Sequence, residues 1–182
     1  MKRHRKETGA FRDRHFPRYP ILAGAAVILS IIFILGAYAA PGKKDGVYKS
    51  YFEDGSLKRV GTYKDGREEG IFTTYYENGR LKYESTYRCG KLDGLRKVYD
   101  LDGVLKYELM YKLGELSGTS KIYYRNGQVK AREQYKEGVL DGRSKLYRED
   151  GVLVNIDTYE DGKKINRKTY DAEGKLENDE DY

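Results

Sequence analysis

The chain has 182 residues, of which 38% are hydrophobic and 35% are charged, and its mean hydropathy of -0.83 indicates that most of it lies in water. The combination of 19 Tyr and 21 Gly with no Trp favours half-buried sheet surfaces and tight turns over helices. The single cysteine, Cys89, excludes an intramolecular disulfide and a cysteine-based metal or redox site.

The formal net charge of +6 is unevenly distributed along the chain. Residues 1–20 hold seven Lys or Arg against two Asp or Glu, a net charge of +5. Residues 41–182 carry 28 basic and 27 acidic side chains, and the stretch from Asp171 to the end contributes -5. The basic balance belongs to the N-terminal tail, so a nucleic-acid partner is not expected.

Residues 21–40 form an apolar run without a charge, bracketed by Pro20 and Pro41. A helix of this length reaches about 30 Å, the thickness of a bilayer core. The run therefore predicts a transmembrane helix after a basic cytoplasmic tail at residues 1–20. Because basic residues stay on the cytoplasmic side, the rest of the chain is expected on the exported side of an inner (cytoplasmic) membrane.

The same run is compatible with a signal peptide, because Ala37-Tyr38-Ala39 fits the small-x-small pattern of signal peptidase sites. Cleavage after Ala39 would release a secreted or periplasmic protein. The run extends to spanning length, however, so an uncleaved anchor is the favoured alternative. Both alternatives export residues 41–182.

From Gly46 onward the sequence repeats with a period of 24 residues, the spacing of the glycines that open each unit. The predicted organisation is a linker at 41–45, units at 46–69, 70–93, 94–117, 118–141 and 142–165, a partial unit at 166–177 and an acidic tail at 178–182. The recurring aromatic and aliphatic residues form a repeat ladder of Tyr51, Tyr75, Tyr99, Tyr123, Tyr147, Leu57, Leu81, Leu105, Val129, Leu153, Tyr63, Tyr87, Tyr111, Tyr135 and Tyr159. The turn glycines are Gly55, Gly79, Gly103, Gly127 and Gly151.

Each unit is predicted to be a β-hairpin, because short runs rich in Tyr, Ile, Val, Leu and Thr alternate with Asp-Gly or Asn-Gly turns. A three-residue loop places Tyr51 opposite Leu57, whereas a two-residue loop places Tyr51 opposite a lysine, so the three-residue loop is expected. In this register Leu81, Tyr83 and Tyr87 are expected to share a face with Tyr75. A single sheet leaves that face uncovered, so it must curl, dimerise or bind a ligand.

The segment from Gly70 to Gly94, GxxxxYYENGxLKxExxYxxGKxxG, resembles the MORN repeat variant of bacterial proteins, including the YwqK-type antitoxin family. The resemblance covers residues 46–176. It implies an all-β fold, an elongated meander of stacked antiparallel hairpins, and association with proteins or lipids without catalysis. An antitoxin role that neutralises a toxin is a further implication of the family name.

No catalytic constellation, metal site or cofactor site is expected. Both histidines, His4 and His15, lie in the N-terminal tail, so the repeats have no imidazole for general base catalysis or metal binding. Asp54, Asp102 and Asp150 precede turn glycines, where Asp is an ordinary turn residue. The chain is therefore predicted not to be an enzyme.

Two surfaces are candidates for binding. The Tyr/Leu face is expected to dock a protein partner or a second copy of the chain, which makes the protein a membrane-anchored scaffold. A row of lysines is expected on the opposite face, where it either keeps the sheet soluble or contacts anionic lipid or an acidic envelope polysaccharide. The lysine row consists of Lys58, Lys82, Lys106 and Lys130.

Overall fold

The structure, a computed structural model, describes residues 43–182, and in this range it contains strands and turns without a helix. No helix there is long and apolar enough to cross a membrane. The predicted transmembrane segment at 21–40 lies outside the described residues. The strands are β1 (Gly46–Tyr51), β2 (Leu57–Lys64), β3 (Arg67–Tyr75), β4 (Leu81–Arg88), β5 (Lys91–Tyr99), β6 (Leu105–Lys112), β7 (Glu115–Leu116), β8 (Gly118–Tyr123), β9 (Val129–Lys136), β10 (Val139–Leu140), β11 (Gly142–Tyr147), β12 (Leu153–Glu160), β13 (Lys163–Tyr170) and β14 (Leu176–Asp181).

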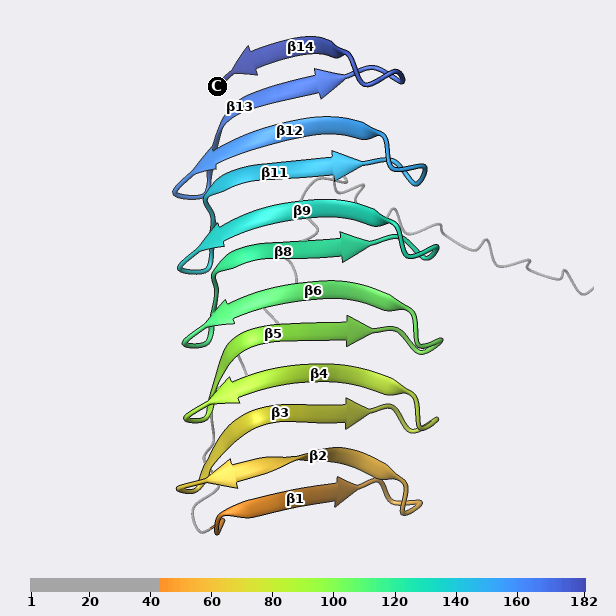
Figure 1. Cartoon of the computed structure of the whole chain (residues 1–182), viewed down its shortest axis with the longest axis vertical. Helices are drawn as coiled ribbons and strands as arrows, with labels where there is room; N and C mark the ends of the chain where they lie inside the picture. Colours follow the sequence, from red (N-terminus) through yellow and green to blue (C-terminus); the bar gives the residue numbers. More distant parts are fainter. Residues whose placement is uncertain (1–42) are drawn as a thin grey trace, which may run out of the picture. The chain divides into compact units, whose positions relative to one another are not determined.

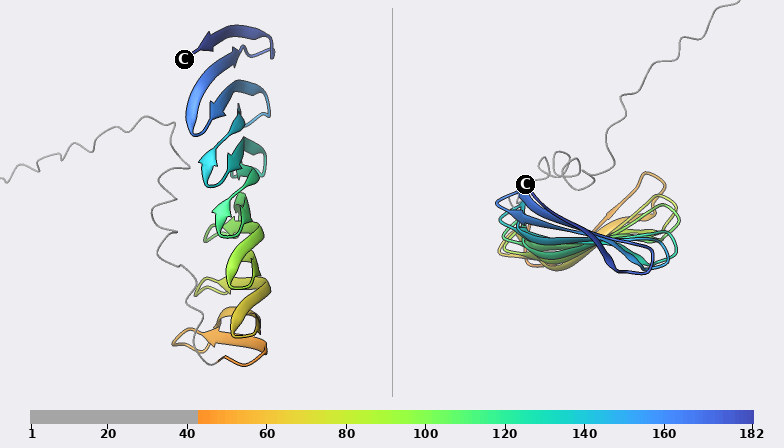
Figure 2. Two further views of the ribbon diagram at one scale, coloured as in Figure 1. Left: turned by 90° about the vertical axis from the view of Figure 1, so that its left-hand side faces the viewer. Right: turned by 90° about the horizontal axis from the view of Figure 1, so that it is seen from above.

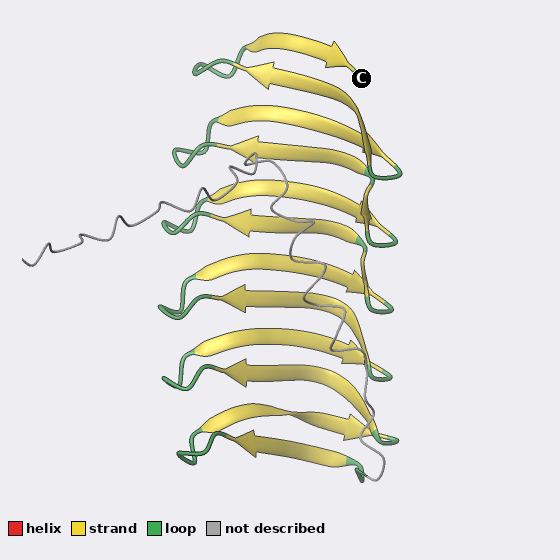
Figure 3. Cartoon of the chain, turned by 180° about the vertical axis from the view of Figure 1, so that it is seen from behind, coloured by secondary structure: helices red, strands yellow, loops and turns green. Residues whose placement is uncertain are grey.

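All of these strands belong to one antiparallel sheet, and nearly every strand pairs with its neighbours in the sequence (Figure 1). The two-residue strands β7 and β10 only extend the edges of β6 and β9. Seen from behind, the sheet is one layer of stacked hairpins with no second layer drawn against it (Figure 3). The predicted all-β hairpin meander is therefore confirmed for residues 43–182.

Each hairpin closes through a three-residue loop, as the apolar pattern predicts. In the first hairpin Tyr51 lies opposite Leu57, and the N–H of Gly55 donates to the carbonyl of Phe52 at 3.0 Å. Gly55 has φ of 84°, a left-handed conformation in which a side chain costs energy. The turn glycines Gly79, Gly103, Gly127 and Gly151 have φ between 77° and 88° and make the equivalent hydrogen bond.

Successive hairpins are joined by two-residue turns in which both residues have positive φ, as type I′ turns require. In the second of these turns Cys89 has φ of 50° and Gly90 has φ of 81°. The Gly90 N–H donates to the carbonyl of Glu68 at 2.9 Å, and the Cys89 N–H donates to the carboxylate of Glu69 at 2.8 Å. The turn of one unit is thus bonded to the preceding unit, which fixes the stacking of the hairpins.

A β-bulge near the end of each hairpin changes which residues share a face. In the second hairpin Thr74 lies opposite Tyr83 and Tyr75 lies opposite Leu81, so the register shifts between Thr74 and Tyr75. Adjacent residues of a strand point to opposite faces. Tyr75 and Leu81 therefore share one face, and Tyr83 and Tyr87 lie on the other. This corrects the prediction that all four share a face, and its cause is the extra residue of the bulge.

The face that carries Tyr83 and Tyr87, here called the inner face, contains the core. Phe72 is 2% exposed and Tyr63 is 7% exposed, values that a flat single layer would not reach. The rings of Tyr48, Tyr63, Phe72 and Tyr87 form a chain of edge-to-face contacts with centroids 5.1 to 5.5 Å apart. The strands are curved and twisted when viewed along the stack (Figure 2), which brings these side chains together.

The final hairpin is complete. The N–H of Tyr182 donates to the carbonyl of Ile165 at 3.0 Å, so Tyr182 closes this hairpin as Tyr159 closes the one before it. The ammonium of Lys164 lies 4.3 Å from the centre of the Tyr182 ring. The structure places the acidic residues 178–181 in β14, paired with β13, rather than in a separate tail.

Candidate binding surface

The face opposite the core, here called the outer face, carries a continuous ladder of alternating tyrosines and aliphatic residues beside the three-residue loops. Each Tyr lies opposite an aliphatic residue of its own hairpin. Tyr51, at one end, is 57% exposed, and the others are half-buried. The outer ladder consists of Tyr51, Leu57, Tyr75, Leu81, Tyr99, Leu105, Tyr123, Val129, Tyr147, Leu153, Tyr170 and Leu176.

The remaining tyrosines of the predicted ladder lie on the inner face at the other end of the strands. Tyr63, Tyr111 and Tyr135 are 5 to 7% exposed, and Tyr87 and Tyr159 are half-buried. Burial raises the pKa of the Tyr111 hydroxyl. Tyr63, Tyr111 and Tyr135 therefore belong to the core and are not available to a partner.

A row of charged side chains crosses the middle of the outer face, next to the ladder. The Lys97 ammonium lies 3.2 Å from the Glu84 carboxylate on the neighbouring strand, and Lys121 lies 2.9 Å from Glu108. Tyr123 donates its hydroxyl to the same Glu108 carboxylate at 2.8 Å. The hydrogen bond from Lys121 is the main reason why the pKa of Glu108 is lowered.

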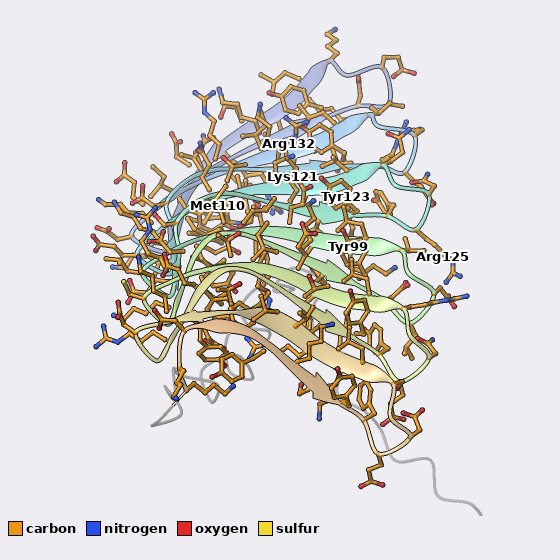
Figure 4. All side chains as sticks on the ribbon, turned by 60° about the horizontal axis from the view of Figure 1, so that its bottom comes forward. Tyr99, Met110, Lys121, Tyr123, Arg125 and Arg132 are labelled. Atoms are coloured by element: carbon orange, nitrogen blue, oxygen red, sulfur yellow. The ribbon has the colours of Figure 1, made fainter. Side chains whose placement is uncertain are left out.

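Further along this row, three cations lie side by side. Arg132 on β9 lies opposite Lys121 on β8 and opposite Lys145 on β11. Arg132 is exposed, and within residues 43–182 no carboxylate forms an ion pair with Arg132 or Lys145. Figure 4 labels Lys121, Tyr123 and Arg132 on these adjoining strands. The outer face thus places cations beside half-buried tyrosines.

The four lysines of the predicted row lie beside the bulges of their hairpins, with their ammonium groups towards the inner face. Lys58 and Lys130 lie over the rings of Phe52 and Tyr124, at 5.3 and 5.6 Å from the ring centres. Lys82 lies 5.0 Å from the Tyr76 ring and 5.3 Å from the Tyr83 ring, whereas Lys106 pairs with Asp100 at 3.3 Å. All four ammonium groups are therefore engaged with the chain itself, as cation–π contacts or an ion pair.

The part of the chain described by the structure shows no group of side chains suited to a metal ion. Its cavities are shallow: one of about 460 Å³ lies by Met110, Leu113 and Gly118, and another of about 370 Å³ lies by Tyr76 and Lys82. Two acids of the inner face are partly or fully buried. The Nε and Nη2 atoms of Arg167 each donate a hydrogen bond to the carboxylate of Asp157 at 2.6 Å, and the hydroxyl of Tyr135 donates a hydrogen bond to the carboxylate of Glu133 at 2.7 Å.

The cation group at Lys121, Arg132 and Lys145 was not among the residues singled out from the sequence. Lys121 and Lys145 are 24 residues apart in the sequence, and only the pairing of their strands with β9 shows that both are neighbours of Arg132. The available signal was the recurrence of Lys97, Lys121 and Lys145 every 24 residues. That spacing predicts a row of lysines on one face once the hairpin register is known.

Stacked hairpins that contact only their neighbours in a single-layer sheet define the class of elongated β-repeat proteins. Four segments, residues 44–65, 68–88, 92–113 and 116–137, match the family model described as MORN repeat variant. These four segments are therefore MORN-variant repeats, as the sequence motif predicts. The hairpins after residue 137 continue the same pairing scheme. No curated protein matches the chain.

Proposed function

We propose that the protein is a non-enzymatic scaffold that binds a partner protein on its outer face. The observation that carries the proposal is the single-layer sheet, whose outer ladder and neighbouring row of cations have no covering layer within residues 43–182. MORN repeats often bind proteins or lipids, which agrees with this assignment. Tyr and Arg are also the residues that contribute most to protein interfaces.

The size of the outer face fits a specific interface. Strands spaced at about 4.8 Å and pairing over about six residues give a surface of roughly 50 by 20 Å, or about 1,000 Å². A typical stable complex buries about 800 Å² on each partner. Because Arg132 and Lys145 have no acidic neighbours in ion-pair contact within the described range, we expect the partner to present carboxylates beside an apolar surface.

The test uses a tagged full-length chain, captured from membranes with its partner after chemical cross-linking. Arg132→Gln should weaken partner binding by about tenfold, the effect of losing about 1.4 kcal/mol at an interface. Arg125→Gln removes the same charge from a loop, where Arg125 pairs with Asp102 at 2.6 Å, and should leave binding intact. Equal binding by both variants, or no captured partner, would refute the proposal.

Membrane anchoring by residues 21–40 is part of this proposal. The apolar run and the preceding basic tail support an inner-membrane protein with the repeats exported. Extraction of membranes at alkaline pH should leave the chain in the pellet, and its N-terminus should map to the tail. A product that begins after Ala39 and is soluble would show secretion instead.

A second candidate is binding of anionic lipid or polysaccharide, favoured by the run of cations formed by Lys121, Arg132 and Lys145 on the outer face. Vesicles that contain an anionic lipid should then bind the chain less after Arg132→Gln and equally well after Lys130→Gln, since Lys130 is engaged with Tyr124. Undiminished binding by Arg132→Gln would remove this candidate.

A further inference from the structure

The sheet has two open edges, and they differ in charge. Within residues 43–182, β1 pairs only with β2 and β14 pairs only with β13, so each leaves a row of backbone N–H and C=O groups without a strand partner. Residues 43–64, the first hairpin, hold six basic and three acidic side chains, a net charge of +3. Residues 165–182, the last hairpin, hold three basic and six acidic side chains, a net charge of -3.

The hairpins inside the array already show how one unit pairs with the next. Glu84 lies opposite Lys97 of the following hairpin, Glu108 lies opposite Lys121, and both pairs form ion pairs at 3.2 and 2.9 Å. Asp179 occupies the matching position in the last hairpin, because it lies opposite Lys168 as Glu108 lies opposite Lys97. Lys49 occupies the matching position of the lysines in the first hairpin.

We propose that the chain associates head to tail, with β14 of one copy pairing with β1 of a second copy in the register that joins hairpins within the array. This register places Asp179 opposite Lys49 of the second copy, an acid–lysine pair of the kind that Glu84 and Lys97 form between hairpins within the array. It also places Glu180 opposite Tyr48, whose ring carries the Lys43 ammonium at 4.8 Å from its centre. The edge association is separate from partner binding on the outer face and goes beyond it.

The charges also select against other edge pairings. β14 carries Glu177, Asp179, Glu180 and Asp181 with no basic residue, so two copies of β14 repel each other. Only the pairing of β14 with β1 brings opposite charges together. Such an interface uses two different surfaces, so it joins copies into open chains, or into a ring where the rotation between copies closes.

The bonds between loops do not prevent this junction. The hydroxyl of Tyr76 donates to the carbonyl of Tyr99 in the next hairpin at 2.8 Å, and Tyr124 does the same with Tyr147. In the third hairpin Asp100 occupies the position of these tyrosines, and that hairpin still pairs with the next one. Asp171 is the equivalent residue of the last hairpin, so the hydroxyl bond is not required for pairing at the junction, although the third and fourth loops are also joined by Arg125 and Asp102 at 2.6 Å.

Disulfide trapping tests the register with full-length chains that carry Cys89→Ser and different tags. A chain with Lys49→Cys, mixed with a chain with Asp179→Cys in mild detergent, should form a disulfide between the two tags under oxidising conditions. Asp181→Cys is the matched control, because it lies on the same strand and face about 7 Å further along. That offset is too long for a disulfide with Lys49→Cys in the proposed register.

Three outcomes would overturn the proposal: a disulfide between two copies of the same variant, equal trapping at Asp181→Cys, or no trapping at all. Sedimentation gives a second measurement that does not need cysteines. Association should depend on concentration in the natural chain, fall severalfold in Asp179→Lys, and return in the double variant Lys49→Asp and Asp179→Lys. A double variant that stays as weak as the single one would also contradict the proposed contact.

Discussion

At the scale of single residues, the two-residue turns hold five residues other than glycine in the left-handed conformation. Four are Asp, Cys or Glu, and the fifth is Leu113, with φ of 53° and 61% exposure. The left-handed conformation costs an ordinary L-residue roughly 1–2 kcal/mol, whereas Asn tolerates it. Leu113 therefore carries a local cost that is not offset by burial.

Replacing Leu113 with Asn should raise the free energy of unfolding by about 1 kcal/mol, because Asn suits a type I′ turn. Denaturant unfolding followed by circular dichroism measures the change. Leu113→Ala keeps the unfavourable backbone conformation while removing the exposed side chain, and should leave stability nearly unchanged. A similar gain from Ala and Asn would mean that backbone conformation is not the cause.

Two glutamates on opposite faces respond to pH in opposite directions. The hydrogen bond from Lys121 lowers the pKa of Glu108, so its stabilising contribution is present above the unfolded pKa and is lost as pH falls through the folded pKa. Burial raises the pKa of Glu133, so the folded state binds more protons there, and stability is lost as pH rises through the window between the two pKa values.

Glu133→Gln should therefore increase stability at pH 7 relative to the natural chain, with little difference near pH 4. Glu108→Gln should decrease stability at pH 7, with the loss shrinking as the solution is acidified. Thermal or denaturant unfolding at several pH values measures both, and each variant serves as the control for the other. The same sign of effect for both variants would contradict the assignment.

At the scale of elements, a tyrosine hydroxyl in every second hairpin donates a hydrogen bond to the next hairpin. Tyr76 donates to the Tyr99 carbonyl at 2.8 Å, and the neighbouring Asn78 side chain donates to the Leu101 carbonyl at 3.2 Å. In the first hairpin Phe52 occupies the position of Tyr76 and has no hydroxyl to donate. Among the first four hairpins, the second and fourth therefore make the tyrosine hydroxyl bond to the next loop, whereas the third loop is joined to the fourth by the ion pair of Asp102 and Arg125.

Tyr76→Phe should lower the free energy of unfolding by about 0.5–1.5 kcal/mol, the usual net contribution of one hydrogen bond. Hydrogen exchange should increase locally in the loop at 100–103, with the strands unaffected. Tyr99→Phe removes a hydroxyl of the outer ladder for which the structure shows no hydrogen bond, and serves as the control. Equal losses from both variants would show that the ring, and not the hydroxyl, is what matters.

The sequence was sufficient to predict the hairpins and their loops, because glycine and Asp or Asn spacing defines a turn and apolar pairing selects Tyr51 opposite Leu57. It did not predict which face each tyrosine occupies. A bulge adds one residue to one strand, and this exchanges the two faces beyond it, as Tyr75 and Tyr83 show. The bulge has no marker of its own in the sequence.

At the scale of the whole molecule, each hairpin contacts only its neighbours, so stability should be distributed along the stack instead of residing in one common core. The last hairpin shows where the repeat spacing alone did not predict the structure. One residue is missing before it, so the spacing to Tyr182 is out of register with the glycines, although Tyr182 closes that hairpin as its predecessors do.

Deletion of residues 165–182 should leave the N-terminal hairpins folded and weaken only the new end. Asp157, which is 3% exposed, would lose its partner Arg167, so faster hydrogen exchange is expected in β11 and β12. Exchange in β1 to β6 should remain within a fewfold of that in the full-length chain. A uniform increase across all strands would show that the array unfolds as a single unit.

Because the hairpins stack regularly, the length of the sheet is proportional to the number of repeats. Each unit adds two strands, or about 10 Å, to the distance between the linker at 43–45 and the C-terminus. Adding or removing a unit would change that reach in fixed steps while every local contact stayed the same. The number of repeats thus sets the distance between the two ends of the sheet.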